Sequence, residues 1–206
     1  MLICFLVIKM FFKNKSGGFE YLIAGLGNPG KEYENTRHNA GFAAADALAE
    51  QFNLNWSKKK FDAIYGDCEI ANTRVIVAKP QTYMNLSGKA VSALAAFYKI
   101  PLDKIIVLFD DVSLDVGKIR IRRKGSSGGQ KGMNNIIDAM GSQDIMRVKI
   151  GVGAKPHPDY DMKDWVLGRI PKEQVSDFKT ATQNAAKAVE EIIANGIDSA
   201  MNKYSK

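Results

Sequence analysis

The chain of 206 residues is 46% hydrophobic and 25% charged, with only 6 prolines, which fits one soluble globular domain and excludes intrinsic disorder, collagen and a long coiled coil. Its 29 lysines and arginines outnumber its 22 aspartates and glutamates, so the net charge is +7 and the isoelectric point is near 9.3. This balance favours an anionic partner. Cys4 and Cys68 form no CxxC pair, and His38 and His157 are the only histidines. We therefore expect no zinc site and a reducing cytoplasm.

The first twelve residues are mostly apolar, but Lys9 interrupts them and the run is far shorter than the ~20 residues that a bilayer span requires. Lysines follow the apolar run and no small-residue cleavage site appears, so a signal peptide is not indicated. We expect residues 1–18 to be an N-terminal extension outside the core, with Met10 as the true start. A single domain is predicted over residues 19–206, without membrane association.

Strand-like and helix-like segments alternate from Phe19 onward. Short β-branched or apolar runs bounded by turn residues predict strands over 19–26, 63–70, 74–78, 104–109, 117–122 and 147–152. Apolar residues at helical spacing predict helices over 40–52, 90–98 and 178–192. This order predicts an α/β sandwich with a largely parallel or mixed sheet. In such sheets the site lies in loops after strand carboxyl ends, so the loops starting at Gly27, Lys79 and Asp110 are the first candidates.

The loop after the first strand, Gly25-Leu-Gly-Asn-Pro-Gly30, matches the GxGxxG pattern of dinucleotide-binding enzymes, which raises a nicotinamide-dependent oxidoreductase. A dinucleotide loop runs directly into a helix, whereas residues 29–33 have turn composition and helical spacing resumes only near Thr36. Glu50 has the expected acidic offset but belongs to a helix face. We therefore reject this interpretation, and a tight turn at the strand end explains the glycines equally well.

His38 lies at the predicted start of the first helix, just after that loop. Imidazole is the side chain best suited to accept a proton from water at neutral pH, so His38 is a candidate general base. A surface or capping histidine is the alternative. His157 stands between Pro156 and Pro158, and we expect it to be structural or exposed.

Polar residues also follow two later strands. The segment from Lys79 to Gly88 leads into a helix, so Asn85 or Ser87 is a candidate N-cap, although the Asn85 amide could instead present a donor and an acceptor to a substrate. The strand 104–109 ends in the carboxylates of residues 110 and 111. Such a pair of carboxylates can bind a metal, or one of them can orient a histidine. Because the sequence offers no other metal ligands, we favour a carboxylate that orients a histidine.

A row of basic residues alternates with other residues along the strand 117–122, so one face carries several cations. Its members are Lys118, Arg120, Arg122 and Lys124. The Gly/Ser-rich loop 125–132 continues this row, and together they predict a phosphate-tracking surface. The loop is no P-loop, because Gln130 stands where Gly is needed and Gly132 where Ser or Thr is needed. A solvated basic edge strand is the alternative.

Taken together, these segments resemble the bacterial peptidyl-tRNA hydrolase family from about Tyr21 to near the end of the chain. The motifs occur in the family's order and spacing: Gly-Leu-Gly-Asn-Pro-Gly, Tyr33, Asn-Thr-Arg-His-Asn-Ala-Gly, Lys-Pro-Gln-Thr-Tyr-Met-Asn-Leu-Ser-Gly, the strand ending Asp-Asp, and the Gly/Ser-rich loop. The resemblance implies a monomeric α/β domain around a twisted mixed sheet flanked by helices. It also implies a cytoplasmic enzyme that cleaves the ester between a peptide and the 3′ ribose of tRNA, without metal or cofactor, and so recycles tRNA after ribosomal drop-off.

The resemblance also implies roles for single residues. His38 would be the general base for the attacking water, and Asp110 the carboxylate that orients it. Asn28 and Asn85 would hold the peptide and the ester carbonyl region of the substrate. A catalytically inactive tRNA- or RNA-binding module of the same fold is the alternative, and these four retained side chains argue against it.

Further positions would contact the acceptor stem and CCA end of the tRNA. Tyr33 and Met84 would line the cleft near the terminal nucleotide, and Arg122 and Lys149 would clamp a phosphate. The basic strand adds two further candidate phosphate contacts, Arg120 and Lys118.

One departure from the family pattern concerns the Gly/Ser-rich loop. The family commonly has Gly-Gly-His-Asn-Gly, whereas this chain has Gly128-Gly-Gln-Lys-Gly132, so Lys131 stands at a functional Asn position. Lysine donates hydrogen bonds and adds charge toward tRNA, but it lacks the acceptor of an amide. We expect Lys131 to bind substrate while placing the water differently.

Overall fold

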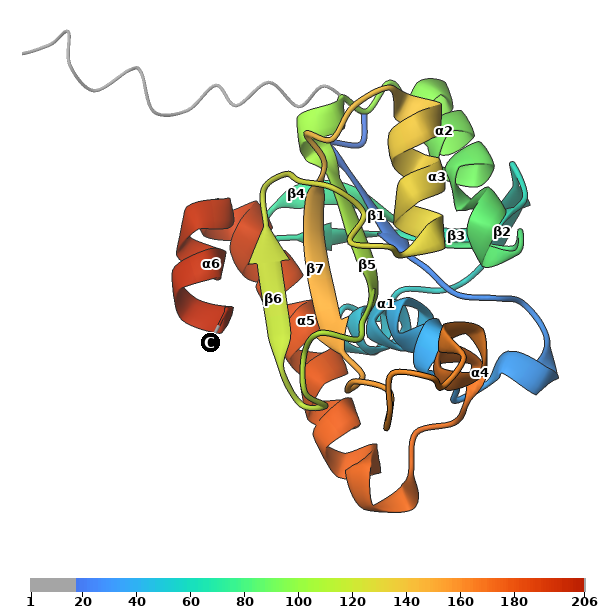
Figure 1. Ribbon diagram of the computed structural model, residues 1–206. Helices are drawn as coiled ribbons and strands as arrows, with labels where there is room; N and C mark the ends of the chain where they lie inside the picture. Colours follow the sequence, from blue (N-terminus) through green and yellow to red (C-terminus); the bar gives the residue numbers. More distant parts are fainter. Residues whose placement is uncertain (1–17, 206) are drawn as a thin grey trace, which may run out of the picture.

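A seven-stranded mixed sheet forms the middle layer of the structure, a computed structural model that describes residues 18–205 (Figure 1). Its strands are β1 (Tyr21–Gly25), β2 (Lys58–Lys60), β3 (Ala63–Ile70), β4 (Thr73–Pro80), β5 (Ile105–Asp111), β6 (Ile119–Arg122) and β7 (Met146–Gly151), in the order β2-β3-β4-β1-β5-β7-β6. The central strands β4, β1, β5 and β7 are mutually parallel, and the remaining strands pair antiparallel at the two edges. The carboxyl ends of the central strands therefore meet at one edge of the sheet.

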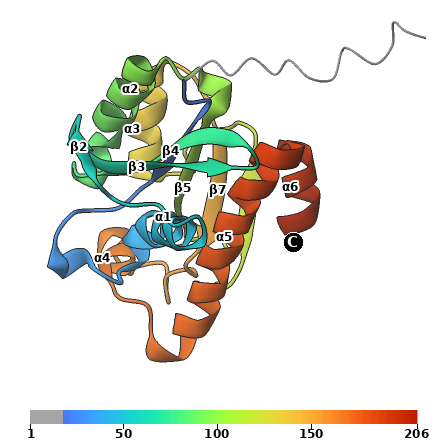
Figure 2. The same cartoon turned by 180° about the vertical axis from the view of Figure 1, so that it is seen from behind.

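Helices cover both faces of this sheet. They are α1 (Ala40–Gln51), α2 (Ser87–Tyr98), α3 (Lys131–Met140), α4 (Met162–Leu167), α5 (Val175–Asn195) and α6 (Ile197–Tyr204). Helices α2 and α3 lie on one face and α1, α5 and α6 on the other, as the two opposite views show (Figures 1 and 2). Among the described helices, none combines the length and the apolar character needed to cross a bilayer.

The core is divided between the two faces by the alternation along each strand. In β1, Tyr21 and Ile23 pack with α1, α5 and α6, whereas Leu22 and Ala24 pack with α2 and α3. Because the central strands are buried on both faces, they have continuous apolar sequences instead of an alternating pattern. This burial made the strands recognisable in the sequence.

The predicted α/β class with a mixed sheet is confirmed, and each predicted strand has a counterpart. The predicted strand 117–122 begins later, at Ile119, because residues before it form a turn. Four elements were not predicted: strand β2, which consists of three lysines, and the helices α3, α4 and α6. The extension proposed for residues 1–18 and the start at Met10 concern a segment that lies, up to residue 17, outside the described residues.

The first turn of α1 lies in backbone contact with the strand ends. A Cβ atom on Gly41 would lie 2.2 Å from the carbonyl oxygen of Leu108 and 2.3 Å from the backbone nitrogen of Leu26. A Cβ atom on Gly25 would lie 2.3 Å from the carbonyl oxygen of Gly41. The first glycine of the GxGxxG pattern thus permits close helix packing, and α1 begins only at Ala40, well after the loop. This arrangement differs from a dinucleotide-binding turn.

Gly41→Ala tests this backbone contact. Within a helix, alanine normally stabilises relative to glycine by about 1 kcal/mol. Here the added methyl group overlaps two backbone groups, so we expect the free energy of unfolding in urea to fall by about 2 to 3 kcal/mol. Gly18→Ala is the control, because a Cβ atom there meets nothing within 4 Å. A Gly41→Ala protein as stable as the parent would contradict the packing argument.

Candidate active site

A cleft of about 710 Å³ opens at the carboxyl ends of the central strands. Its walls come from the loops after β1, β4 and β5, the loop before α3, strand β7 and helix α4. The structure brings together there the predicted residues Asn28, Tyr33, His38, Met84, Asn85, Asp110, Lys131 and Lys149. Within residues 18–205, no three His, Cys, Asp or Glu side chains gather as candidate metal ligands.

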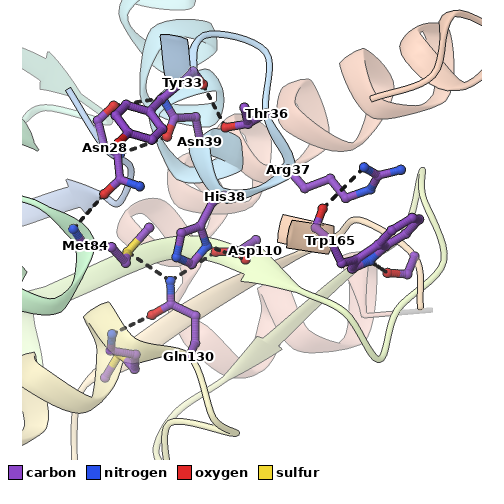
Figure 3. A network of polar contacts seen from close by, with 12 residues as sticks. Asn28, Tyr33, Thr36, Arg37, His38, Asn39, Met84, Asp110, Gln130 and Trp165 are labelled. Carbon is purple, nitrogen blue, oxygen red and sulfur yellow. Dashed lines mark hydrogen bonds and ion pairs between the residues drawn. The ribbon is translucent and has the colours of Figure 1, made fainter. Parts of the chain in front are cut away.

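The side chains of His38 and Asp110 form a buried pair inside the cleft. His38 belongs to a 3-10 turn, Arg37–Asn39, that leads directly into α1, and its Nδ1 lies 2.9 Å from Asp110 Oδ2 (Figure 3). The two side chains are 11% and 2% exposed. An ionised carboxylate only accepts hydrogen bonds, so Nδ1 carries the proton and donates it. The lone pair on Nε2 is therefore left for the cleft.

Asn28 is held by a set of complementary hydrogen bonds. Its Oδ1 accepts a hydrogen bond of 2.7 Å from the backbone N–H of Met84, and its own backbone N–H donates to Asn39 Oδ1 at 2.8 Å. Asn39 Nδ2 in turn donates to the carbonyl oxygen of Asn28 at 3.0 Å. Because the side-chain oxygen of Asn28 is committed to Met84, its NH₂ group is directed to the other side, where Figure 3 shows His38. Asn39 was not among the predicted site residues, although it directly follows His38.

The segment between β4 and α2 places further residues at the cleft. Asn85 is exposed on the 3-10 turn Met84–Leu86, and α2 has no side-chain cap. The predicted capping by Asn85 or Ser87 is therefore wrong, because the Ser87 hydroxyl donates to the Met84 carbonyl at 2.8 Å instead. Tyr33 packs edge to face against Tyr83, with ring centroids 6.5 Å apart. Tyr83, 59% exposed, is a cleft aromatic that sequence analysis missed.

Asp110 has a second partner, Gln130, which was not among the predicted site residues. Gln130 Nε2 lies 3.0 Å from Asp110 Oδ1 and 3.1 Å from Met84 Sδ. Its Oε1 accepts a hydrogen bond of 2.7 Å from the backbone N–H of Met133, so Gln130 is the N-cap of α3. The contacts appear in the lower half of Figure 3. Its position as a polar residue directly before a helix could have identified Gln130 as an N-cap from the sequence.

The predicted basic residues occupy different environments. Lys149 lies in the cleft, and its Nζ is 2.8 Å from Asp111 Oδ2. On the edge strand β6, Arg122 is exposed and Arg120 is half-buried opposite Lys149. Lys118 is exposed in the turn before that strand. Arg120 and Arg122 on the edge strand, and Lys118 just before it, thus lie outside the residues that line the cleft.

Known proteins resemble this chain in sequence and in structure. The sequence model of a family described as peptidyl-tRNA hydrolase matches residues 22–206. The chain belongs to the peptidyl-tRNA hydrolase family. Peptidyl-tRNA hydrolases of Lachnospira eligens and Caldanaerobacter subterraneus are 49% and 51% identical to it, over 90% of this chain and 99% of each relative. The crystal structure of peptidyl-tRNA hydrolase from Acinetobacter baumannii has a TM-score of 0.84 at 33% identity, covering 90% of this chain and 96% of the other.

These matches decide between the functions that the sequence left open. The chain is an ester hydrolase that acts on peptidyl-tRNA in translation. Neither the nicotinamide-dependent oxidoreductase nor the inactive binding module finds support among the matches.

A buried arginine holds the hydrolase's Gly/Ser-rich loop in place. Arg147 is 1% exposed and donates hydrogen bonds to the carbonyl oxygens of Gly125, Ser126 and Gln143 at 2.6, 2.9 and 2.8 Å. Burial lowers the pKa of its guanidinium. Since this loop leads to Gln130, Arg147 supports the site from below the surface. Its role depends on contacts with residues distant in the sequence, so the residues next to Arg147 in the chain did not indicate this role.

Arg37 holds helix α4 beside the 3-10 turn Arg37–Asn39 of the hydrolase. The Arg37 guanidinium lies 3.5 Å from the centroid of the Trp165 ring and donates to the carbonyl oxygen of Arg169 at 3.0 Å. Trp165 Nε1 donates to the carbonyl oxygen of Gly153 at 2.9 Å. Because Arg37 directly precedes His38, one wall of the cleft and the histidine share an anchor (Figure 3).

The Asp111–Lys149 pair predicts how the hydrolase responds to acid. Burial raises the pKa of the Asp111 carboxyl, but hydrogen bonds from Lys149 and Ser113 outweigh it, so the pKa lies below its ordinary value of 3.8. A lowered folded-state pKa stabilises the protein above the unfolded value, and the effect is lost as pH falls through the folded value. We therefore expect Asp111→Asn to lower the free energy of unfolding in urea at pH 7 and to lower it less at pH 3.

The partner residue provides the control for this pH dependence. Lys149→Met removes the same ion pair, so it should show the same smaller loss at pH 3 than at pH 7. A stability difference between parent and Asp111→Asn that does not change with pH would contradict the assignment.

Proposed function

We propose that His38 is the general base of the hydrolysis and that Asp110 orients its ring. The observation that carries this proposal is the 2.9 Å contact between His38 Nδ1 and Asp110 Oδ2 within the cleft. Neutral Nε2 takes a proton from water while the water oxygen attacks the ester carbonyl. The tetrahedral oxyanion then collapses, the bond to the 3′ oxygen of tRNA breaks, and the imidazolium returns the proton to that oxygen.

Amide groups stabilise the charge that develops in this step. The NH₂ group of Asn28 is the donor best supported for the oxyanion, because its oxygen is already bound to Met84. Asn85 holds the peptide side of the substrate, and Lys131 contributes a cation where related enzymes commonly have Asn. An ester is already activated, so a positioned base and a held carbonyl suffice without a covalent intermediate, a metal or a cofactor.

The tRNA binds through its CCA end and acceptor stem. Tyr33 and Met84 contact the terminal nucleotide at the cleft, and Arg122 and Lys149 clamp a phosphate. Arg122 is the freer cation of the two, because Lys149 already pairs with Asp111. Further phosphate contacts come from Arg120 and Lys118. The enzyme acts as a monomer in the cytoplasm, with residues 19–206 as its single domain.

His38→Ala tests the general base. We expect single-turnover hydrolysis of N-acetyl-aminoacyl-tRNA to slow by about 10² to 10⁴, the usual contribution of such a base, while tRNA affinity stays near that of the parent. His157→Ala is the matched control, because His157 is exposed and does not line the cleft. EDTA is present throughout. Full activity of His38→Ala would refute the assignment, and loss of parent activity in EDTA would refute the metal-free mechanism.

Arg122→Ala tests the phosphate contact. We expect KM to rise with kcat nearly unchanged, because a phosphate contact contributes to binding and not to the reacting atoms. The slope of log(1/KM) against log salt should decrease by about 1. Arg123→Ala removes the same charge from the next residue, whose guanidinium binds Asp198 at 2.8 Å, and should change neither. An equal loss of kcat at saturating substrate would contradict this role for Arg122.

A further inference from the structure

Gln130 connects the proposed catalytic pair to a helix of the fold. It is 8% exposed, with Nε2 at 3.0 Å from Asp110 Oδ1 and Oε1 at 2.7 Å from the backbone nitrogen of Met133. Asp110 therefore uses one oxygen for His38 and the other for Gln130. The side chain thus has a contact beyond that of a helix cap.

The orientation of the Gln130 amide is fixed by its two partners. The carboxylate of Asp110 only accepts hydrogen bonds, and the backbone N–H of Met133 only donates. In a flipped amide, Oε1 would face the carboxylate oxygen of Asp110 and the NH₂ group would face the backbone N–H of Met133. Only one orientation therefore satisfies both contacts. The donor toward Asp110 is therefore determined by the fold.

The helix that carries this cap has little freedom to shift. A Cβ atom on Gly132 would lie 2.5 Å from Met84 Sδ, and one on Gly88 would lie 2.3 Å from the carbonyl oxygen of Asn135. The first residues of α3 are thus packed directly against Met84, and α3 against α2. Gln130 presents its N–H group from a rigid support.

This support determines where the Asp110 carboxylate points. The terminal torsion of an aspartate has a broad energy profile, so a single contact leaves the carboxylate plane free to turn. Hydrogen bonds at both carboxylate oxygens of Asp110 fix the plane of the carboxylate and keep Oδ2 within hydrogen-bond distance of His38 Nδ1. Without the Gln130 donor, Oδ1 would be a buried acceptor with one partner fewer.

We propose that Gln130 is a positioning residue of the hydrolysis, which holds Asp110 and through it the His38 tautomer. This inference rests on the roles proposed above for His38 and Asp110. Gln130 is uncharged at every pH, so it supplies a donor to Asp110 that does not titrate. Its contribution is to kcat, because both polar atoms of its amide are already bonded within the protein, to Asp110, Met84 and Met133.

Two substitutions separate positioning from capping. Gln130→Met keeps the chain length but removes donor and acceptor together. Gln130→Glu keeps the length and an acceptor for Met133, so the cap remains, but its ionised form cannot donate to Asp110. Gln183→Glu, on the exposed side of α5, is the control for the added charge.

We expect kcat of both Gln130 variants at pH 8 to fall about tenfold or more, as for a lost hydrogen bond to a charged group, with KM within about twofold of the parent. The deficit of Gln130→Glu should be smaller at pH 6, because the adjacent carboxylate of Asp110 raises the pKa of the new side chain and its protonated form donates. Gln183→Glu should match the parent at both pH values.

Two results would overturn the inference. If Gln130→Glu keeps the parent kcat at pH 8, only the cap matters, whatever happens to Gln130→Met. If Gln130→Met keeps the parent kcat and loses only thermal stability, Gln130 does not act on the reaction. His38→Ala in the same assay separates a failure of this inference from a failure of the proposed general base. If His38→Ala is inactive, the results above concern Gln130 alone. If it is fully active, the proposed base and this inference are both wrong.

Discussion

The backbone contact between the start of α1 and the ends of β1 and β5 is the constraint on which the site depends. Gly25 and Gly41 allow this contact, because a Cβ atom at these positions would lie 2.3 and 2.2 Å from a backbone oxygen, well inside van der Waals contact. His38 precedes α1 by one short turn, so the position of the helix sets the position of the imidazole. Asp110 is the last residue but one of the neighbouring strand β5, and its carboxylate lies directly against the His38 ring.

Around this contact, the cleft is built from polar groups whose donors and acceptors match. Asn28 with Asn39 and Asp110 with Gln130 each bind through groups that have one satisfactory orientation. Burial makes each unmatched group costly, so these pairs hold one another in place. The same matching leaves the NH₂ group of Asn28 and Nε2 of His38 without a hydrogen bond among the described residues, so both are available for the ester and the water of the proposed mechanism.

The sequence predicted those parts of the molecule that depend on local pattern. Strands buried on both faces are continuous apolar runs. His38 and Asp110 stand where a helix begins and a strand ends, so both could be named as candidates. β2 was missed because three lysines carry no apolar signal, and its strand conformation comes from pairing with β3. Gln130 and Arg147 act on groups distant in the chain, and the capping expected of Asn85 or Ser87 failed because a 3-10 turn leads into α2 instead. Tertiary contacts, which the local sequence does not show, determine the strand β2, the contacts of Gln130 and Arg147, and the start of α2.

The stacking of Arg37 on Trp165 also gives the enzyme an internal optical probe. The chain has two tryptophans, and Trp56 is not among the residues lining the cleft. The Trp165 indole has a cation 3.5 Å from its ring centroid and a hydrogen bond to a carbonyl, on a helix that forms one wall of the cleft. Its emission is therefore sensitive to the local field and solvation of that wall. In a chain with Trp56 replaced by Phe, fluorescence would report the wall as substrate enters and tRNA leaves.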